Sequence, residues 1–128
     1  MSLVPVSTPA APAAIGPYSQ AVEATGSRFL FLSGQIPLDP ATGQLKNASV
    51  AEEVAQVLAN LQAVLAAAGA SPASLVKTTI FLTDMADFAV VNEAYAAWLG
   101  EHRPARATIA VKALPRGARV EIEGIAIL

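Results

Sequence analysis

The chain has 128 residues, of which 14% are charged, with a net charge of −2, a single His and no Cys. This length suits one domain over residues 1–128 with a substantial hydrophobic core. The absence of Cys excludes disulfides and thiolate metal sites, and the acidic balance argues against non-specific RNA binding, which normally uses a basic patch. The nearest approach to such a patch is a loose group at Lys112, Arg116 and Arg119.

The low charge content predicts an oligomer. Charged residues make up about 25% of a typical soluble domain, so 14% leaves little to coat an isolated monomer. We therefore expect apolar surface between subunits. Residues 1–14 lack the Lys and Arg of a secretory signal, and no apolar run is long enough to span a bilayer, so the expected compartment is the cytoplasm.

The first part of the chain predicts an arm followed by two strands. Residues 1–14 are expected to form the arm. Ser19–Thr25 and Arg28–Ser33 are predicted strands, and Thr25-Gly26-Ser27 between them is a predicted hairpin turn. Residues 37–47 contain Pro, Asp and Gly and are predicted to form a loop.

Two helices are predicted from apolar spacing and end signals. The first runs over Val50–Ala68, with Ser49 and Glu52 as a capping box and Gly69 as its C-terminal cap. Its apolar stripe consists of Val50, Val54, Val57, Leu58, Leu61, Val64 and Leu65. The second helix runs over Phe88–Leu99, and its core side consists of Phe88, Val91, Tyr95, Trp98 and Leu99. Its predicted N-terminal cap is Asp84 or Asp87.

The remaining strands are predicted at Leu75–Leu82, Ala105–Val111 and Arg119–Leu128, with a loop at 114–117. This order of elements predicts an α+β fold in which two helices pack on one face of a mixed sheet. Since the other face of the sheet must also be buried, we expect it to pack against a second subunit.

Arg106 and Glu121 are the most informative residues, because each lies in a segment that otherwise resembles a buried strand. Arginine and glutamate are seldom buried without a partner. Arg106 offers a fork for a carboxylate, and a glutamate can position and deprotonate water. Together they suggest a site for a small acidic molecule. The alternatives are a mutual salt bridge and, for Glu121 and Glu123, a solvated strand face.

Other candidates each have a simpler structural explanation. Tyr18 follows a Gly-Pro turn, Ser33 and Gly34 end a strand, and Asn92 lies beside the apolar face of the second helix. His102 is too isolated for a zinc site and is expected to cap the helix before it, so no metal is predicted.

Six segments, in order over nearly the whole chain, resemble the reactive-intermediate deaminase (Rid/YjgF) family. They are Ala-Ile-Gly-Pro-Tyr-Ser-Gln (14–20), Ser-Gly-Gln-Ile-Pro (33–37), Val-Lys-Thr-Thr-Ile-Phe-Leu-Thr-Asp-Met (76–85), Val-Asn-Glu-Ala-Tyr (91–95), Arg-Pro-Ala-Arg-Ala-Thr (103–108) and Leu-Pro-x-x-Ala-x-Val-Glu-Ile-Glu (114–123). The resemblance implies a chorismate-mutase-like fold and a homotrimer with sites in the clefts between subunits.

The same resemblance implies hydrolysis of reactive 2-imino acids, such as 2-iminobutanoate and 2-iminopropanoate, to 2-oxo acids and ammonia. These imines and enamines come from pyridoxal-phosphate enzymes, and their removal protects other enzymes from damage. No cofactor or metal is implied. Two other functions stay open: a non-catalytic oligomeric module that binds a small carboxylate or a protein, and an endoribonuclease.

By this resemblance Arg106 binds the substrate carboxylate, and Glu121, rather than Glu123, positions the water. The implied substrate-binding residues are Tyr18, Ser33, Gly34, Asn92 and Thr108. Many deaminases of this type carry cysteine at the position of Thr108, whose backbone N–H can still meet the carboxylate. The subfamily and the preferred imine therefore stay open, as does the subunit that supplies each side chain.

Overall fold

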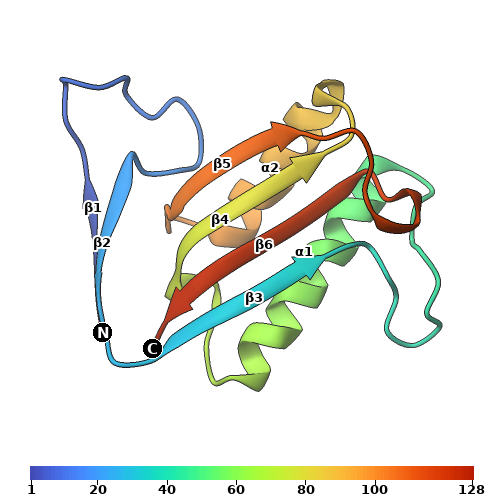
Figure 1. Cartoon of the computed structure of the whole chain (residues 1–128), viewed down its shortest axis with the longest axis horizontal. Coiled ribbons are helices and arrows are strands. Elements are labelled where there is room, and N and C mark those ends of the chain that lie inside the picture. The colour runs from blue at the N-terminus through green and yellow to red at the C-terminus, as the bar shows by residue number, and fades with distance from the viewer.

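In the computed structural model, which describes residues 1–128, two helices cover one face of a four-stranded sheet (Figure 1). The strands are β1 (Ser2–Val6), β2 (Ala21–Thr25), β3 (Phe29–Gln35), β4 (Leu75–Leu82), β5 (Ala105–Ala110) and β6 (Val120–Ile127). The helices are α1 (Val50–Ala67) and α2 (Phe88–Leu99), with short 3₁₀ turns at Pro72–Ser74, Met85–Asp87 and Pro115–Gly117. Neither helix could cross a membrane, since none is both long and apolar enough.

The sheet is mixed, as the sequence predicted. Its strand order is β3-β6-β4-β5, with β4 parallel to β5 and β6 antiparallel to both of its neighbours. The α+β class with both helices on one face is confirmed. β1 and β2 form a separate antiparallel pair, which joins the rest of the fold where Ser19 bridges Ala105 of β5.

The predicted hairpin turn at Thr25-Gly26-Ser27 is wrong. β2 pairs with β1, in a register that sets Val4 opposite Glu23, and the chain passes at Gly26 from one sheet to the other. β1 itself was missed, because Pro5 lacks a backbone N–H and weakens any strand pattern. Such a residue is tolerated in an edge strand, which is the position of β1.

α1 begins and ends at the predicted signals. The Ser49 hydroxyl oxygen accepts a hydrogen bond from the backbone N–H of Glu52 at 3.1 Å. At the other end Gly69 takes a φ of +75°, and the N–H of Ala70 bonds the carbonyl of Leu65 at 2.8 Å. This hydrogen bond joins the first and last residues of a six-residue segment. Together with a glycine in the left-handed conformation, it forms a Schellman motif. Of the predicted stripe, Val64 is 39% exposed and lies outside the core.

The core fills the space between the helices and the sheet. Its largest fully buried side chains come from α1, α2 and the strands; they include Val54, Val57, Leu61, Leu65, Val91, Tyr95, Leu75, Ile80, Leu82, Val120 and Ile122. Since side chains alternate along a strand, the residues between them point to the other face of the sheet. On that face Phe29 and Phe31 are stacked and are 60% and 71% exposed.

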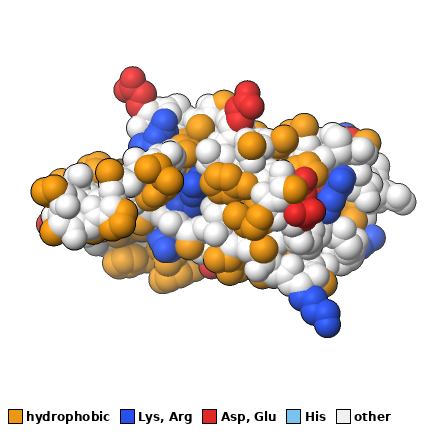
Figure 2. Space-filling view, turned by 90° about the horizontal axis from the view of Figure 1, so that it is seen from above, with side chains coloured by type: hydrophobic (Ala, Val, Ile, Leu, Met, Phe, Trp, Pro, Cys, Tyr) orange, Lys and Arg blue, Asp and Glu red, His pale blue; other side chains and the backbone are white.

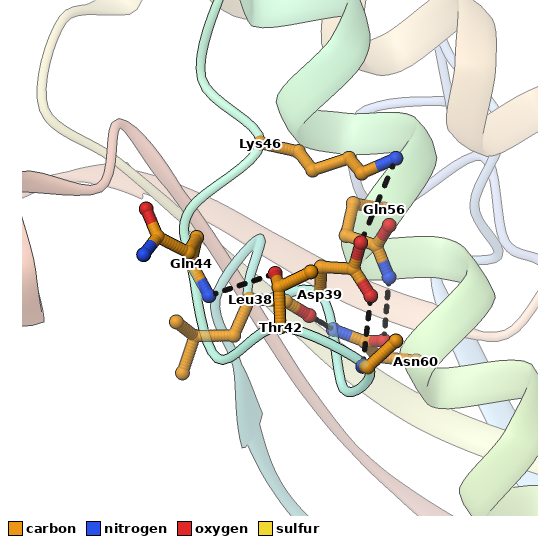
Figure 3. Close-up of polar contacts among 8 residues, drawn as sticks. Leu38, Asp39, Thr42, Gln44, Lys46, Gln56 and Asn60 are labelled. Atoms are coloured by element: carbon orange, nitrogen blue, oxygen red, sulfur yellow. Dashed lines mark hydrogen bonds and ion pairs between the residues drawn. The ribbon is translucent and has the colours of Figure 1, made fainter.

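Asn60 of α1 ties down the loop that follows β3 (Figure 3). Its side-chain amide donates to the carbonyls of Leu38 at 2.9 Å and Ile36 at 3.2 Å, and its oxygen accepts from Gln56 at 2.8 Å. Lys46 pairs with Asp39 across the loop at 3.7 Å. The C-terminal end of β3 is therefore held against α1.

His102 does not cap α2 as expected. Its ring Nε2 lies 2.7 Å from the carbonyl oxygen of Leu75, at the start of β4. Similarly, Asp84 bonds the N–H of Ala86 in the 3₁₀ turn ahead of α2, and Asp87 makes no capping bond. Of these polar groups, only His102 links the end of α2 to the sheet. No group of three or more His, Asp or Glu residues that could hold a metal ion is found in the chain.

A buried carboxylate joins α1 to the start of β6. Glu53 is fully buried and accepts from the backbone N–H of Arg119 at 2.8 Å and from the Arg119 guanidinium. Arg119 also donates to the carbonyl of Asn47 at 3.0 Å. The sequence did not single out this pair, because Glu53 follows another glutamate in the first helical turn and resembles a solvated residue.

Glu53→Ala is expected to lower the free energy of unfolding by about 3 kcal/mol, because it leaves a buried N–H and a guanidinium without their acceptor. Denaturant unfolding measures this change. Glu52→Ala, in the same turn, is the control and is expected to cost no more than about 0.5 kcal/mol. Equal losses in the two variants would contradict the anchoring role of Glu53.

Candidate functional site

A cavity of about 420 Å³ opens at the edge of the sheet, on the side covered by the helices. It lies between the loop before β2, the start of α2, and β5. Its lining consists of Ile15, Gly16, Tyr18, Met85, Phe88, Asn92, Arg106 and Thr108. The volume falls in the usual range for small-molecule sites, and most of the lining is apolar around a few polar groups.

Arg106 of β5 projects into this cavity from the helix side of the sheet. It lies opposite Thr78 of β4, whose buried hydroxyl is 2.7 Å from the hydroxyl of Tyr95 in α2. The guanidinium carbon lies 5.2, 5.4 and 5.7 Å from the ring centres of Tyr18, Tyr95 and Phe88. Three aromatic faces thus surround the cation.

Asn92 orients the guanidinium. Its side-chain oxygen accepts a hydrogen bond from Nη1 of Arg106 at 2.6 Å. Phe88, Asn92 and Tyr95 are spaced by four and three residues along α2, so they share the helix face that looks toward β5. An arginine carries five N–H donors, and the bond to Asn92 uses one of them. The others are free to meet a ligand.

The Arg106 cation has no carboxylate partner in the chain. The two ion pairs join Lys46 to Asp39 and Arg119 to Glu53. Burial lowers the pKa of Arg106 from its usual value, and the hydroxyls of Tyr95 and Tyr18 oppose this change. Burial likewise raises the pKa of Tyr95, against the hydrogen bond to Thr78 and the charge of Arg106. A partly desolvated cation without a counter-ion favours an anionic ligand.

Gln20 holds the loop that carries Tyr18 and Gly16. Its side-chain oxygen accepts from the N–H of Thr8 at 2.6 Å, and its amide donates to the carbonyl of Pro12 at 2.6 Å. Next to it, the N–H of Ser19 donates to the carbonyl of Pro104 at 3.1 Å, which docks the loop on the start of β5. No pattern in the sequence selects Gln20 as a functional residue, because its role depends on the folded loop.

Glu121 lies on the opposite face of the sheet from Arg106. In the register of β4 against β6, Glu121 is opposite Phe81, whereas Arg106 is opposite Thr78 on the β5 side. Thr78 and Phe81 are three residues apart, and side chains an odd number apart point to opposite faces. The suggested salt bridge between Arg106 and Glu121 within one chain is therefore wrong.

Glu121 has its own neighbours at the end of β3. The pairing of β3 with β6 is irregular between Leu32 and Gln35, and Gly34 lies in this irregularity. A Cβ at position 34 would come within 2.8 Å of the carboxyl carbon of Glu121, so only glycine lets the carboxylate lie against the backbone there. Ser33 is exposed beside it.

The predicted site residues thus fall into two groups. The first lines the cavity and consists of Arg106, Tyr18, Asn92 and Thr108. The second lies on the open face and consists of Glu121, Gly34 and Ser33. Phe88 and Tyr95 were assigned to the core from their helical spacing, and their second role beside Arg106 was missed.

The chain is similar to several known proteins. A family model described as endoribonuclease L-PSP matches residues 8–128. Protein DfrA of Myxococcus xanthus is 54% identical over 117 residues, which cover 91% of this chain and 89% of the relative. The 2-iminobutanoate/2-iminopropanoate deaminase of Mus musculus is 53% identical over 122 residues, which cover 95% of this chain and 89% of the relative.

Solved structures share the fold. A Thermotoga maritima structure is 49% identical, with a TM-score of 0.77 and coverage of 98% of this chain and 97% of that one. E. coli TdcF with bound serine is 40% identical, with a TM-score of 0.75 and 98% coverage of both chains.

Asn92→Ala is expected to weaken binding of a small monocarboxylate such as propionate by about fivefold, because the guanidinium loses the hydrogen bond that fixes its direction. Titration followed by NMR chemical shifts measures the affinity. Glu93→Ala, at the next and exposed position of α2, is the control. Unchanged affinity in Asn92→Ala would contradict the assigned role.

Proposed function

The chain belongs to the endoribonuclease L-PSP family, also known as Rid/YjgF, and from this premise we propose that it hydrolyses 2-imino acids to 2-oxo acids and ammonia. The observation that carries the proposal is the unpaired Arg106 cation in its aromatic cavity. It is suited to hold the carboxylate of such a substrate by two parallel hydrogen bonds.

Two relatives support this substrate class. The mouse protein that is 53% identical is named for 2-iminobutanoate and 2-iminopropanoate. The E. coli TdcF structure holds serine, an amino acid with a carboxylate and a nitrogen on the neighbouring carbon. A 2-imino acid has the same arrangement of these two groups. We therefore place the carboxylate at Arg106, with Tyr18, Asn92 and Thr108 around it.

We assign Glu121 to the same reaction from a neighbouring copy of the chain. Within one chain the sheet separates Glu121 from Arg106. The open face around Glu121 exposes Phe29, Phe31 and Ile109, which is typical of a surface buried between subunits. In a homotrimer the open face of one subunit would meet the cavity edge of the next, and Ser33, Gly34 and Glu121 would complete the site.

The proposed reaction needs one acid/base group and good positioning. As water attacks the imine carbon, the carboxylate of Glu121 takes one of its protons, and a C–OH group forms. Glu121 passes this proton to the nitrogen, which gives a carbinolamine with a hydroxyl and an NH2 group. Glu121 then takes the hydroxyl proton and delivers it to the NH2 group, so the C–N bond breaks, the C=O forms, ammonia leaves and Glu121 is again a carboxylate. Because imines also hydrolyse unaided, orientation by Arg106 and proton transfer by Glu121 are sufficient.

A non-catalytic carboxylate-binding module is the second candidate, since Arg106 alone supports binding. The two candidates differ in what they require of Glu121, because only hydrolysis needs its carboxylate. An RNA-cleaving function is less well supported: Lys and Arg side chains lie scattered over the face in Figure 2 rather than gathered in a stripe.

With imine generated from threonine by a dehydratase, the protein is expected to accelerate release of 2-oxobutanoate. Arg106→Ala should lower kcat/KM about a hundredfold by loss of positioning. Glu121→Gln should lower kcat about a hundredfold while retaining 2-oxobutanoate binding. Glu123→Gln, two residues along the same strand face, is the matched control and should resemble the parent.

Parent-like rates in Arg106→Ala would overturn the assignment of the carboxylate site. If the parent binds 2-oxobutanoate but accelerates no imine tested, the binding module is the better description.

A further inference from the structure

The hydroxyl of Thr108 is the one buried side-chain nitrogen or oxygen in the chain that lacks a hydrogen-bond partner. Buried polar groups are nearly always hydrogen-bonded, so an exception calls for a physical reason. Thr108 lies two residues beyond Arg106 on β5, on the same side of the sheet, and lines the same cavity. The residue that carries the unpaired hydroxyl therefore lines the ligand cavity, although the oxygen itself is shielded.

The surroundings explain why no protein group satisfies this hydroxyl. Thr108 lies opposite Ile80 of β4, a fully buried aliphatic side chain. From the other elements, Phe88 and Met85 line the same cavity and offer no strong acceptor. Asn92 has such an acceptor, its side-chain oxygen, which is already bonded to Arg106. The fold thus leaves a hydroxyl without a partner on a residue that lines the same cavity as the uncompensated cation.

A change of χ1 rotamer would turn the hydroxyl toward a ligand in the cavity. Thr108 as a whole is half-buried, although its oxygen is shielded. Rotation about χ1 by about 120°, to the next staggered rotamer, moves the hydroxyl into the position that the methyl group occupied. Because the hydroxyl makes no hydrogen bond in its present position, the rotation breaks none.

We propose that the side-chain hydroxyl of Thr108 donates a hydrogen bond to the carboxylate held by Arg106 and so sets the affinity for small carboxylate substrates. This inference rests on the proposed function for the identity of the substrate. A carboxylate has two oxygens and about four acceptor positions, so it can bond the guanidinium and the hydroxyl together. A hydrogen bond to a charged group contributes more than one between neutral groups.

The test compares Thr108→Val with Thr108→Ser. Valine keeps the shape and removes the hydroxyl, whereas serine keeps the hydroxyl. Calorimetric titration with 2-oxobutanoate, the stable product of the proposed reaction, is expected to give a Kd about tenfold weaker for Thr108→Val and within about threefold of the parent for Thr108→Ser. Thr25→Val, on the exposed strand β2, is the control for the Thr-to-Val exchange.

Thermal unfolding supplies a readout that separates ligand binding from a structural role. An unpaired buried hydroxyl contributes nothing to the unligated fold, so Thr108→Val should have an unchanged or higher Tm without ligand. A parent-like Kd in Thr108→Val would overturn the proposal. So would a lower Tm of Thr108→Val with a matching loss of binding in Thr108→Ser, which would indicate a structural hydroxyl.

Failure of this inference differs from failure of the proposed function. If the parent hydrolyses imines and Thr108→Val has the parent KM, the function stands and the role of Thr108 is wrong. If the parent hydrolyses no imine but binds 2-oxobutanoate in a manner that depends on Thr108, the carboxylate contact stands and the proposed reaction is wrong.

Discussion

The register of β4 against its two neighbours determines both the core and the site. β4 pairs with β5 on one side and β6 on the other, and alternate residues along it point to opposite faces. Thr78, Ile80 and Leu82 face the helices and are buried. Arg106 shares their face and Glu121 does not. A shift of one residue in either pairing would move Arg106 or Glu121 to the opposite face of the sheet.

The helix face gives Arg106 an environment that an exposed strand could not provide. α2 brings Phe88, Asn92 and Tyr95 over β5, and the loop held by Gln20 adds Tyr18 from the other side. The aromatic rings partly desolvate the cation without neutralising it. Arg106 therefore carries an uncompensated positive charge at the cavity. An anionic ligand bound there would neutralise this charge.

Much of this arrangement could be predicted from the sequence. The apolar period of α1, the Schellman glycine at Gly69 and the β-branched run of β4 are local signals, and they gave nearly correct bounds. The motifs around Tyr18, Asn92, Arg106 and Thr108 selected residues that line one cavity.

The errors arose where pairing between distant segments decides the structure. No local pattern states that β2 pairs with β1 rather than β3, because a glycine turn suits either path. Alternation within β6 places Glu121 and Glu123 on one face, but only the register with β4 tells which face that is. The buried role of Glu53 depends in the same way on Arg119, 66 residues away.

In the proposed homotrimer, Arg106 and Glu121 act in one site but come from two copies of the chain. The direct measurement mixes the inactive variants Arg106→Ala and Glu121→Gln in equal amounts, by co-expression or joint refolding, and follows imine hydrolysis. Random assembly should restore about a quarter of the parent activity, because one interface in four joins an intact Arg106 to an intact Glu121. Mixed oligomers no more active than either variant alone would contradict the claim, since no chain in the mixture carries both residues.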